Sequence, residues 1–193
     1  TGMCTMKEVK DAIRIIIKYG TAKKNITLLH CTSEYPAPIN EINLNAMVSM
    51  KKEFNINVGY SDHSLGIEVP IAAAALGAKV IEKHITLNKK DYGPDHKSSI
   101  SFIELKQMIN YIRNIEKALG DGFKKPSKSE KKNISIVRKF IVAKRNIKKG
   151  EVFTLENLTT KRSGKGINPF NLNKIIGKKS LYNFKEDEVI KIK

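Results

Sequence analysis

The sequence contains no tryptophan, only two cysteines and no long apolar run among its 193 residues. A membrane-spanning helix needs about 18 or more consecutive apolar residues, and a signal peptide needs successive basic, apolar and small-residue regions. Neither pattern occurs, so we expect a cytoplasmic protein without a membrane partner. Cys4 and Cys31 lack a partner at the short spacing of zinc or redox motifs, which predicts two reduced core thiols.

Acidic residues are scarce, because 19 Asp+Glu stand against 36 Lys+Arg and give a net charge of +17. The excess is uneven: residues 1–96 carry +2, whereas residues 97–193 carry +15. Proteins that read bases rely on arginine for bidentate contacts, but 31 of the 36 basic residues are lysines without interleaved aromatics. We therefore expect no nucleic-acid partner. The basic field suits attraction of an anionic substrate such as a phosphate ester.

The first 120 residues alternate predicted helices with short buried strands. Thr5 and Glu8, and again Ser101 and Glu104, have the spacing of a capping box at a helix start. Helices are predicted from Thr5 to Gly20, along the face of Leu44, Met47 and Val48, and over 70–76 and 101–119; strands are predicted over 26–31, 58–63 and 79–86. This order predicts an α/β fold with a parallel sheet, either doubly wound or closed into a barrel.

The composition changes after residue 120. Residues 121–133 contain Gly122, Pro126, two serines and five lysines without an apolar period, which predicts a linker. Beyond it, short β-like runs separated by turns predict a small, mostly β domain over 134–193; the runs are 140–143, 152–154, 158–161 and 188–192.

Polar residues stand where two of the predicted strands end. Alternation along a strand places Ser61 with His63 on one face, and Glu82 with His84 likewise. In a parallel barrel, reactive groups lie at the carboxyl ends of the strands. Two neutral imidazoles leave most of a divalent metal's coordination open for substrate. The alternative is that each histidine is only hydrogen-bonded in the core, which is the interpretation that we favour for His30.

Several motifs, in one order along nearly the whole chain, resemble those of the sialic acid synthase family. In the first part they are HCTSEYPAP (30–38), GYSDH (59–63), VIEKHIT (80–86) and GPDHKS (93–98). In the second part, 144–150, 156–158 and KRSGKG (161–166) are similar to the antifreeze-like, or SAF, domain of that family. The resemblance implies the C-terminal part of a TIM (βα)8 barrel over 1–120, a linker over 121–133 and a mostly β SAF domain of β-clip type over 134–193.

The resemblance also implies a reaction and a set of site residues. A synthase of this family condenses phosphoenolpyruvate with the open-chain aldehyde of N-acetylmannosamine, releasing phosphate and forming N-acetylneuraminate. His63 and His84 would bind a divalent metal, Mn²⁺ or Mg²⁺, and act in catalysis together with Glu82. Substrates would be contacted by Ser33, Tyr35, Ser61, Asp95 and Arg162. The family pattern implies a homodimer in which the SAF domain of one subunit, with its arginine, covers the barrel of the other.

Other functions stay open at this point. A synthase of N,N'-diacetyllegionaminate, which would use a 2,4-diacetamido sugar, shares nearly every motif; a pseudaminic acid synthase fits Gly93 to His96 less well. The chain could also be a non-catalytic module that binds carbohydrate or protein, and nucleic-acid binding by the basic tail would show as a steep salt dependence. Because three strands cannot close a barrel, we expect these residues alone to be inactive and poorly soluble.

Overall fold

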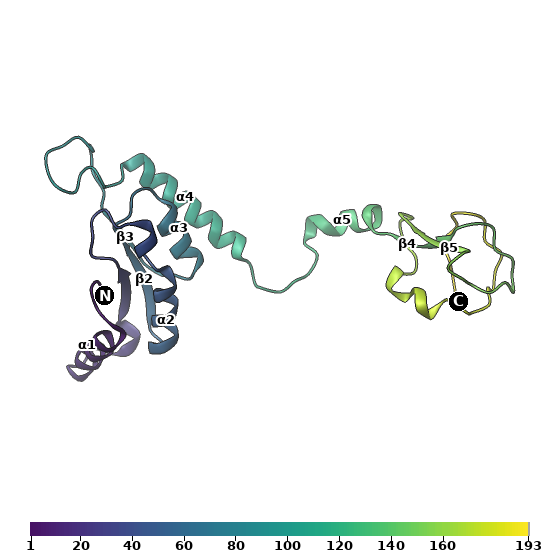
Figure 1. Cartoon of the computed structure of the whole chain (residues 1–193), viewed down its shortest axis with the longest axis horizontal. Coiled ribbons are helices and arrows are strands. Elements are labelled where there is room, and N and C mark those ends of the chain that lie inside the picture. The colour runs from purple at the N-terminus through teal and green to yellow at the C-terminus, as the bar shows by residue number, and fades with distance from the viewer. Residues whose placement is uncertain (193) are drawn as a thin grey trace. The chain divides into compact units, whose positions relative to one another are not determined.

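The computed structural model describes residues 1–192 and divides the chain into two compact units, Thr1–Gly122 and Phe123–Lys193. The first unit is mixed α/β, as predicted. Its elements are α1 (Met6–Lys18), β1 (Thr27–Cys31), α2 (Leu44–Phe54), β2 (Asn57–Asp62), α3 (Glu68–Ala75), β3 (Ile81–Lys83) and α4 (Phe102–Leu119), with short 3₁₀ turns at Lys23–Asn25 and Ile39–Glu41 (Figure 1). No helix within residues 1–192 is both long and apolar enough to cross a membrane.

The three strands form a parallel sheet in the order β1-β2-β3. β1 pairs with β2 from Thr27↔Asn57 to Cys31↔Ser61, and β2 pairs with β3 from Tyr60↔Ile81 to Asp62↔Lys83. Consecutive parallel strands connected through helices are the βαβ arrangement that the sequence predicts. The carboxyl ends of all three strands therefore lie at the same edge of the sheet.

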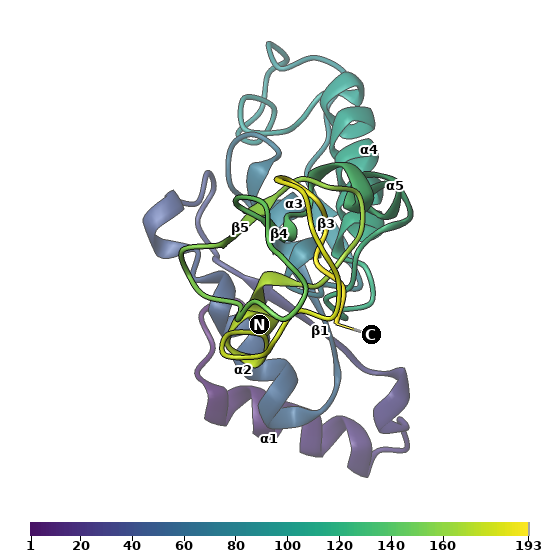
Figure 2. The same cartoon turned by 90° about the vertical axis from the view of Figure 1, so that its right-hand side faces the viewer.

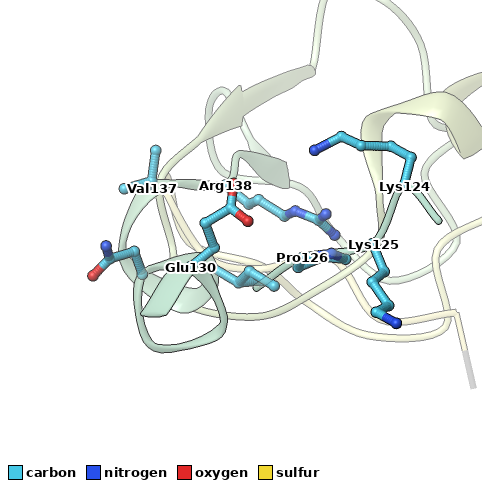
Figure 3. Close-up of a pocket in the computed structure, with 8 residues that line it drawn as sticks. Lys124, Lys125, Pro126, Glu130, Val137 and Arg138 are labelled. Atoms are coloured by element: carbon cyan, nitrogen blue, oxygen red, sulfur yellow. The ribbon is translucent and has the colours of Figure 1, made fainter. Parts of the chain in front are cut away.

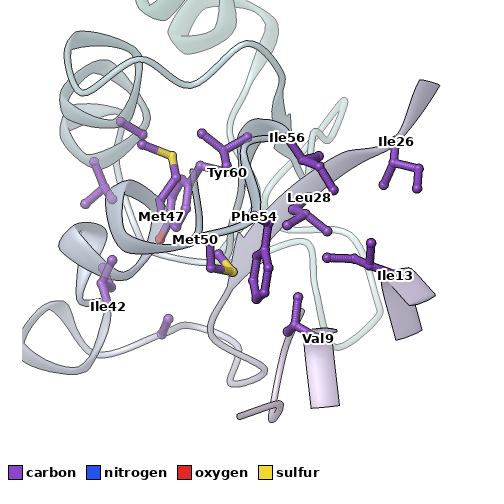
Figure 4. Packing of buried hydrophobic residues seen from close by; sticks show 14 residues of the cluster. Val9, Ile13, Ile26, Leu28, Ile42, Met47, Met50, Phe54, Ile56 and Tyr60 are labelled. Carbon is purple, nitrogen blue, oxygen red and sulfur yellow. The ribbon is translucent and has the colours of Figure 1, made fainter. Parts of the chain in front are cut away.

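The core of the first unit lies between the sheet and its helices. Met47 and Met50 of α2 and Tyr60 of β2 are among its buried residues (Figure 4). Val58 of β2 belongs to the same cluster. A second cluster joins α3 to α4, which pack side by side (Figures 1 and 2). Alternate strand residues point to opposite faces, so Val58 and Tyr60 face the helices while Ser61 faces away from them.

Capping residues set where the helices begin. The predicted capping boxes of Thr5 with Glu8 and of Ser101 with Glu104 are both present at α1 and α4. A third box, Ser127 with Glu130, begins α5 (Lys128–Val137) inside the predicted linker. Residues 128–133 of the predicted linker thus belong to a helix, which the lysine-rich composition concealed although a serine and a glutamate stand at capping-box spacing.

The bounds of two strands differ from the predicted ones, and one of the two thiols that were predicted to be buried is exposed. β3 covers only 81–83 of the predicted 79–86; beyond it the chain bends to pair with Ile100 through the backbone of His84 and Thr86. The chain also leaves β2 at Asp62, one residue early. Cys4 is exposed rather than buried, because it lies in the turn before α1, while Cys31 is half-buried.

In the second unit, β4 (Phe140–Ala143) and β5 (Leu158–Lys161) form an antiparallel pair, followed by the 3₁₀ turn Pro169–Lys174. Residues 152–154 and 188–192 do not form strands, and only the single bridges of Val152 with Lys179 and of Val189 with Val142 remain of them. Loops wrap a separate apolar core that contains Ile141, Phe153 and Phe184, among others. The unit is thus built mainly from turns and isolated bridges.

Candidate functional site

Ser61 and Glu82 face each other on neighbouring strands. They are register partners of β2 and β3, and the Ser61 hydroxyl donates to Oε1 of Glu82 at 2.6 Å. Ser61 is 6% exposed, whereas Glu82 is exposed. The pair lies on the face that points away from the helices. The structure therefore joins two of the predicted site residues through a charge-assisted hydrogen bond.

His63 directly follows β2, and its ring is bonded to the backbone of Thr32, the residue that follows β1. Its Nδ1 lies 2.9 Å from the Thr32 carbonyl oxygen and 3.9 Å from Sγ of Cys31. A carbonyl can only accept, so Nδ1 must carry the proton when this bond forms, and Nε2 keeps its lone pair. The His63 carbonyl in turn accepts from the backbone N–H of Ala37 at 2.9 Å, which fixes the loop after β1 beside the ring.

His84 follows β3 in the same way and lies next to His63. The two imidazole rings meet nearly perpendicularly, at 82°, with their centroids 5.4 Å apart. Nδ1 of His84 is 3.7 Å from Oδ2 of Asp95, too far for a hydrogen bond but close enough for charge attraction if the ring is protonated. Asp95 thus reaches the same edge of the sheet from the loop after β3.

Tyr35 covers both histidines. Its ring centroid is 4.4 Å from that of His84 and 5.3 Å from that of His63, the latter contact edge to face. The Tyr35 hydroxyl lies 3.2 Å from Oγ of Ser99, which donates to the carbonyl of Asp95. Burial, and then the charges of Asp95 and Asp62, raise the pKa of the Tyr35 hydroxyl. The hydroxyl therefore stays protonated at neutral pH and can donate a hydrogen bond.

His63 and His84 could supply nitrogen ligands to a divalent cation that keeps open positions. Within residues 1–192, no group of three or more His, Cys, Asp and Glu side chains is arranged to hold a metal. Each imidazole can supply one nitrogen ligand. In His63 this nitrogen is Nε2, whose lone pair stays free because Nδ1 donates to the Thr32 carbonyl. A cation held in this way would take its other ligands from water or substrate, which is the arrangement of a catalytic rather than a structural site.

Two predicted site residues stand apart from this group. Ser33 is exposed, and its Oγ lies where a side chain at Gly2 would be, so it borders the loop before α1. Arg162 is exposed in the second unit, directly after β5. The first unit by itself therefore places two groups at the carboxyl ends of its strands. One is the bonded pair of Ser61 and Glu82. The other consists of Tyr35, His63, His84 and Asp95, which contact one another.

Sequence reasoning missed several residues around the histidines. Ser99 ties Tyr35 to the Asp95 loop, and Thr32 fixes the His63 ring through its backbone. A buried ion pair joins Lys83 to Asp62 at 2.6 Å. Backbone carbonyls leave no sequence signal, and only the register of β2 with β3 shows that Asp62 and Lys83 face each other.

A pocket in the second unit lies against α5 (Figure 3). It is lined by Lys124, Lys125, Pro126, Glu130, Asn133, Ile134, Val137 and Arg138. None of the predicted site residues is among them. We assign no chemistry to this pocket, because its basic side chains belong to a solvent-facing helix and the segment before it.

Two family models match the chain. The model described as NeuB family matches residues 1–124, and the model of the SAF domain matches residues 138–193. The division between them agrees with the two compact units of the structure.

Curated relatives match over nearly the whole chain. It is 56% identical to the N,N'-diacetyllegionaminic acid synthase of Campylobacter jejuni over 191 residues, which are 99% of this chain and 57% of that protein. It is 38% identical to a pseudaminic acid synthase of the same species over 99% of this chain and 55% of that protein. Identity to the human N-acetylneuraminate-9-phosphate synthase is 36%, covering 98% and 53% respectively. The chain thus spans about half the length of these relatives.

Two solved structures are similar to this chain. The N-acetylneuraminic acid synthetase of Leptospira borgpetersenii, solved with citrate, has a TM-score of 0.62 and 37% identity over 69% of this chain and 46% of that one. A spore coat polysaccharide biosynthesis protein E of Chromobacterium violaceum, described as putative, has a TM-score of 0.69 over 97% of this chain and 56% of that one; at 22% identity it shows the fold alone. The chain belongs to the NeuB family of sialic acid-type synthases and carries a SAF domain.

Proposed function

We propose that this chain carries the metal site of a synthase that joins phosphoenolpyruvate to an N-acetylated amino sugar. The methylene carbon of phosphoenolpyruvate bonds to the aldehyde carbon of the open-chain sugar, water adds to C2, and the bond from C2 to the phosphate oxygen breaks. The products are a nine-carbon 2-keto acid and phosphate. The observation that carries this proposal is the pair of imidazoles, His63 and His84, meeting beside Ser61 and Glu82 in a chain of this family.

His63 and His84 are the residues that would hold the divalent cation, Mn²⁺ or Mg²⁺. When bound, such a cation supplies a Lewis acid for the aldehyde oxygen of the sugar. Nitrogen ligands favour Mn²⁺ over Mg²⁺, which prefers oxygen. The protein's own contribution is to hold the rings at a fixed angle through Thr32 and Tyr35.

Glu82 is the group that we assign to proton transfer. Its carboxylate is exposed on the face away from the helices and accepts a hydrogen bond from the Ser61 hydroxyl. A carboxylate in this place can take or return a proton at the oxygen of the forming alcohol. Ser61 would contact phosphoenolpyruvate. Because its only proton is donated to Glu82, the hydroxyl must turn away before it can donate to a phosphate or carboxylate oxygen of that substrate.

Asp95, Tyr35 and Ser33 complete the substrate contacts that we propose. The Asp95 carboxylate, 52% exposed in its side chain, is free to accept from sugar hydroxyls while it remains near His84. Tyr35 keeps a protonated hydroxyl that can donate to an oxygen. Ser33, exposed at the start of the same loop, would donate to phosphoenolpyruvate.

Sequence identity favours one sugar among the candidates. The chain is 56% identical to the N,N'-diacetyllegionaminic acid synthase of Campylobacter jejuni, against 38% for the pseudaminic acid synthase and 36% for the human N-acetylneuraminate-9-phosphate synthase. We therefore propose a 2,4-diacetamido sugar as the preferred acceptor, with N-acetylmannosamine as the second candidate.

The relatives' greater length bears on how the site is completed. We propose that the βαβ units of residues 1–120 form part of a (βα)8 barrel, and that the whole enzyme is a cytoplasmic homodimer. In that assembly the SAF domain of one subunit would bring Arg162 over the barrel of the other, where a guanidinium can bond the planar acetamido group. We expect residues 1–193 alone to be inactive.

The complete gene product tests this function directly. It is incubated with Mn²⁺, phosphoenolpyruvate labelled with ¹⁸O at the C2–O–P bridge, and either sugar. We expect a nine-carbon 2-keto acid and phosphate that retains the label, with the higher kcat/KM for the 2,4-diacetamido sugar. Unlabelled phosphate would contradict cleavage of the carbon–oxygen bond, and no product from either sugar would overturn the proposal.

A further inference from the structure

We infer that Asp62, Lys83 and Ser64 form a buried positioning network that fixes the angle between His63 and His84. The inference rests on the proposed function, because it assigns the network a purpose only if the two imidazoles share a cation. None of the three is a predicted site residue. Their role follows from their contacts and from their places in the chain.

The network is fully buried and internally bonded. Lys83 Nζ lies 2.6 Å from Oδ2 of Asp62, and the two side chains are 4% and 0% exposed. The same Nζ donates to the Ser64 carbonyl at 2.7 Å. Oδ1 of Asp62 accepts from the Ser64 backbone N–H at 2.9 Å and from its hydroxyl at 2.7 Å, and Ser64 is 0% exposed. Both carboxylate oxygens are thus occupied.

The place of the network along the chain links it to the histidines. Asp62 and Lys83 are the last register partners of β2 and β3, and each directly precedes a histidine. Ser64 directly follows His63. The residues on both sides of His63, and the residue before His84, are therefore joined in one set of charge-assisted hydrogen bonds.

A role in binding substrate is excluded by direction and burial. Successive strand residues point to opposite faces, so Asp62 and Lys83 lie on the helix side while Ser61 and Glu82 lie on the other. Side chains that are at most 4% exposed have no surface to offer a ligand. A role in stability alone is a weak explanation, because a buried ion pair gains little over apolar residues of the same volume. Its directional bonds do, however, specify one geometry.

The test measures the Kd of Mn²⁺ for the complete gene product by titration, together with kcat, the KM of each substrate and Tm. The double variant Asp62→Asn/Lys83→Met removes both charges at once, so that no single charge is left buried. We expect its Kd to rise about 10- to 100-fold, the usual effect of losing groups that orient metal ligands. Ser64→Ala, which keeps the ion pair, should raise Kd about threefold, and Lys83→Arg should restore most of the affinity lost in Lys83→Met.

The pair Lys89–Glu104 provides the control. It lies in the same unit with an Nζ to Oε2 distance of 2.7 Å, but it is partly exposed and does not flank a histidine. Lys89→Met/Glu104→Gln should lower Tm without changing the Kd of Mn²⁺. The positioning role is overturned if Asp62→Asn/Lys83→Met and Ser64→Ala both bind Mn²⁺ within twofold of wild type. If wild type itself binds no Mn²⁺, the proposed metal site fails as well.

Discussion

His63 and His84 stand one residue beyond the last paired positions of β2 and β3, and their imidazole rings meet at 82° with centroids 5.4 Å apart. Parallel pairing explains this meeting, because strands in register end at the same edge of the sheet. Tyr35 packs against both rings from the loop after β1. The segments that follow three consecutive strands therefore contribute one aromatic side chain each to a single site.

Replacing Glu82 should slow the chemical step without unfolding the protein. Glu82→Gln keeps the size of the side chain and a partner for Ser61, but it removes the charge and the ability to take a proton. We expect kcat to fall about 10²- to 10⁴-fold, as for loss of a general acid or base, with KM nearly unchanged. Steady-state kinetics of the complete gene product measures this, and Tm within about 2 °C of wild type confirms the fold. An unchanged kcat would show that Glu82 does not transfer the proton.

Tyr35 should contribute through its ring and its hydroxyl separately. Tyr35→Phe keeps the contacts with His63 and His84 but loses the bond to Ser99, so we expect only a few-fold rise in the KM of the sugar. Tyr35→Ala removes ring contacts with the histidines worth about 1 kcal/mol, which corresponds to a change of about fivefold in an equilibrium constant. Its Kd for Mn²⁺ should rise accordingly, whereas that of Tyr35→Phe should not. Equal Mn²⁺ affinity in both variants would show that the ring does not support the site.

Arg162 is expected to act on the sugar and not on the metal. In the proposed dimer, Arg162→Ala should raise the KM of the sugar about tenfold or more, while the Kd of Mn²⁺ and the KM of phosphoenolpyruvate stay the same. Arg162→Lys keeps the charge but lacks the planar fork, so it should recover little. Arg145→Ala, another exposed arginine of the same unit, is the control. Loss of sugar affinity in both alanine variants would point to a general effect of charge.

The cap of α4 should make stability depend on acid pH. The Lys89 ammonium, and then the backbone N–H and hydroxyl of Ser101, lower the pKa of Glu104 from 4.5 to about 2. A pKa that is lower in the folded state adds stability above the unfolded value, and this stability is lost as the pH falls through the folded value. The Tm difference between wild type and Glu104→Gln should thus be full above pH 4.5 and close toward pH 2. A difference that persists at pH 2 would contradict the assignment.

The same cap offers a test at neutral pH. Ser101→Ala removes the side chain that accepts from the Glu104 backbone N–H, and we expect unfolding to become easier by about 1 kcal/mol. Urea denaturation of the complete gene product measures this change in the free energy of unfolding, provided that the variant and wild type have the same m-value. Glu116→Gln on the same helix, which breaks only an exposed ion pair with Arg113, should change the free energy of unfolding by less than about 1 kcal/mol.

Local patterns predicted the first unit well, because its elements depend on short-range signals. The capping boxes of α1 and α4 are in the sequence, and the alternation of Ser61 with Asp62 set which side chains share a face. β3 was predicted too long, because apolar residues continue past Lys83 although the chain bends there to pair with Ile100. Pairing between distant segments leaves no periodic signal.

The second unit was harder to predict for the same reason. Residues 152–154 and 188–192 are apolar enough for strands, yet each makes only an isolated bridge. The places of His63 and His84 at the strand ends predicted that the two histidines meet, and their rings do lie in contact. The ion pair of Asp62 with Lys83 was not predicted. Its two members belong to different strands, and only the register of β2 with β3 shows that they face each other.

The most direct measurement is a titration of the complete gene product with Mn²⁺, in which electron paramagnetic resonance monitors the binding of the ion. Wild type should bind one Mn²⁺ per chain, and His63→Ala and His84→Ala should each weaken binding at least about 100-fold and abolish condensation. The His30 ring bonds the Ile42 carbonyl on the helix side of the sheet. The control variant His30→Gln should therefore bind Mn²⁺ as wild type does. Binding that survives both site substitutions, or none in wild type, would contradict the claim that these two imidazoles share a metal ion.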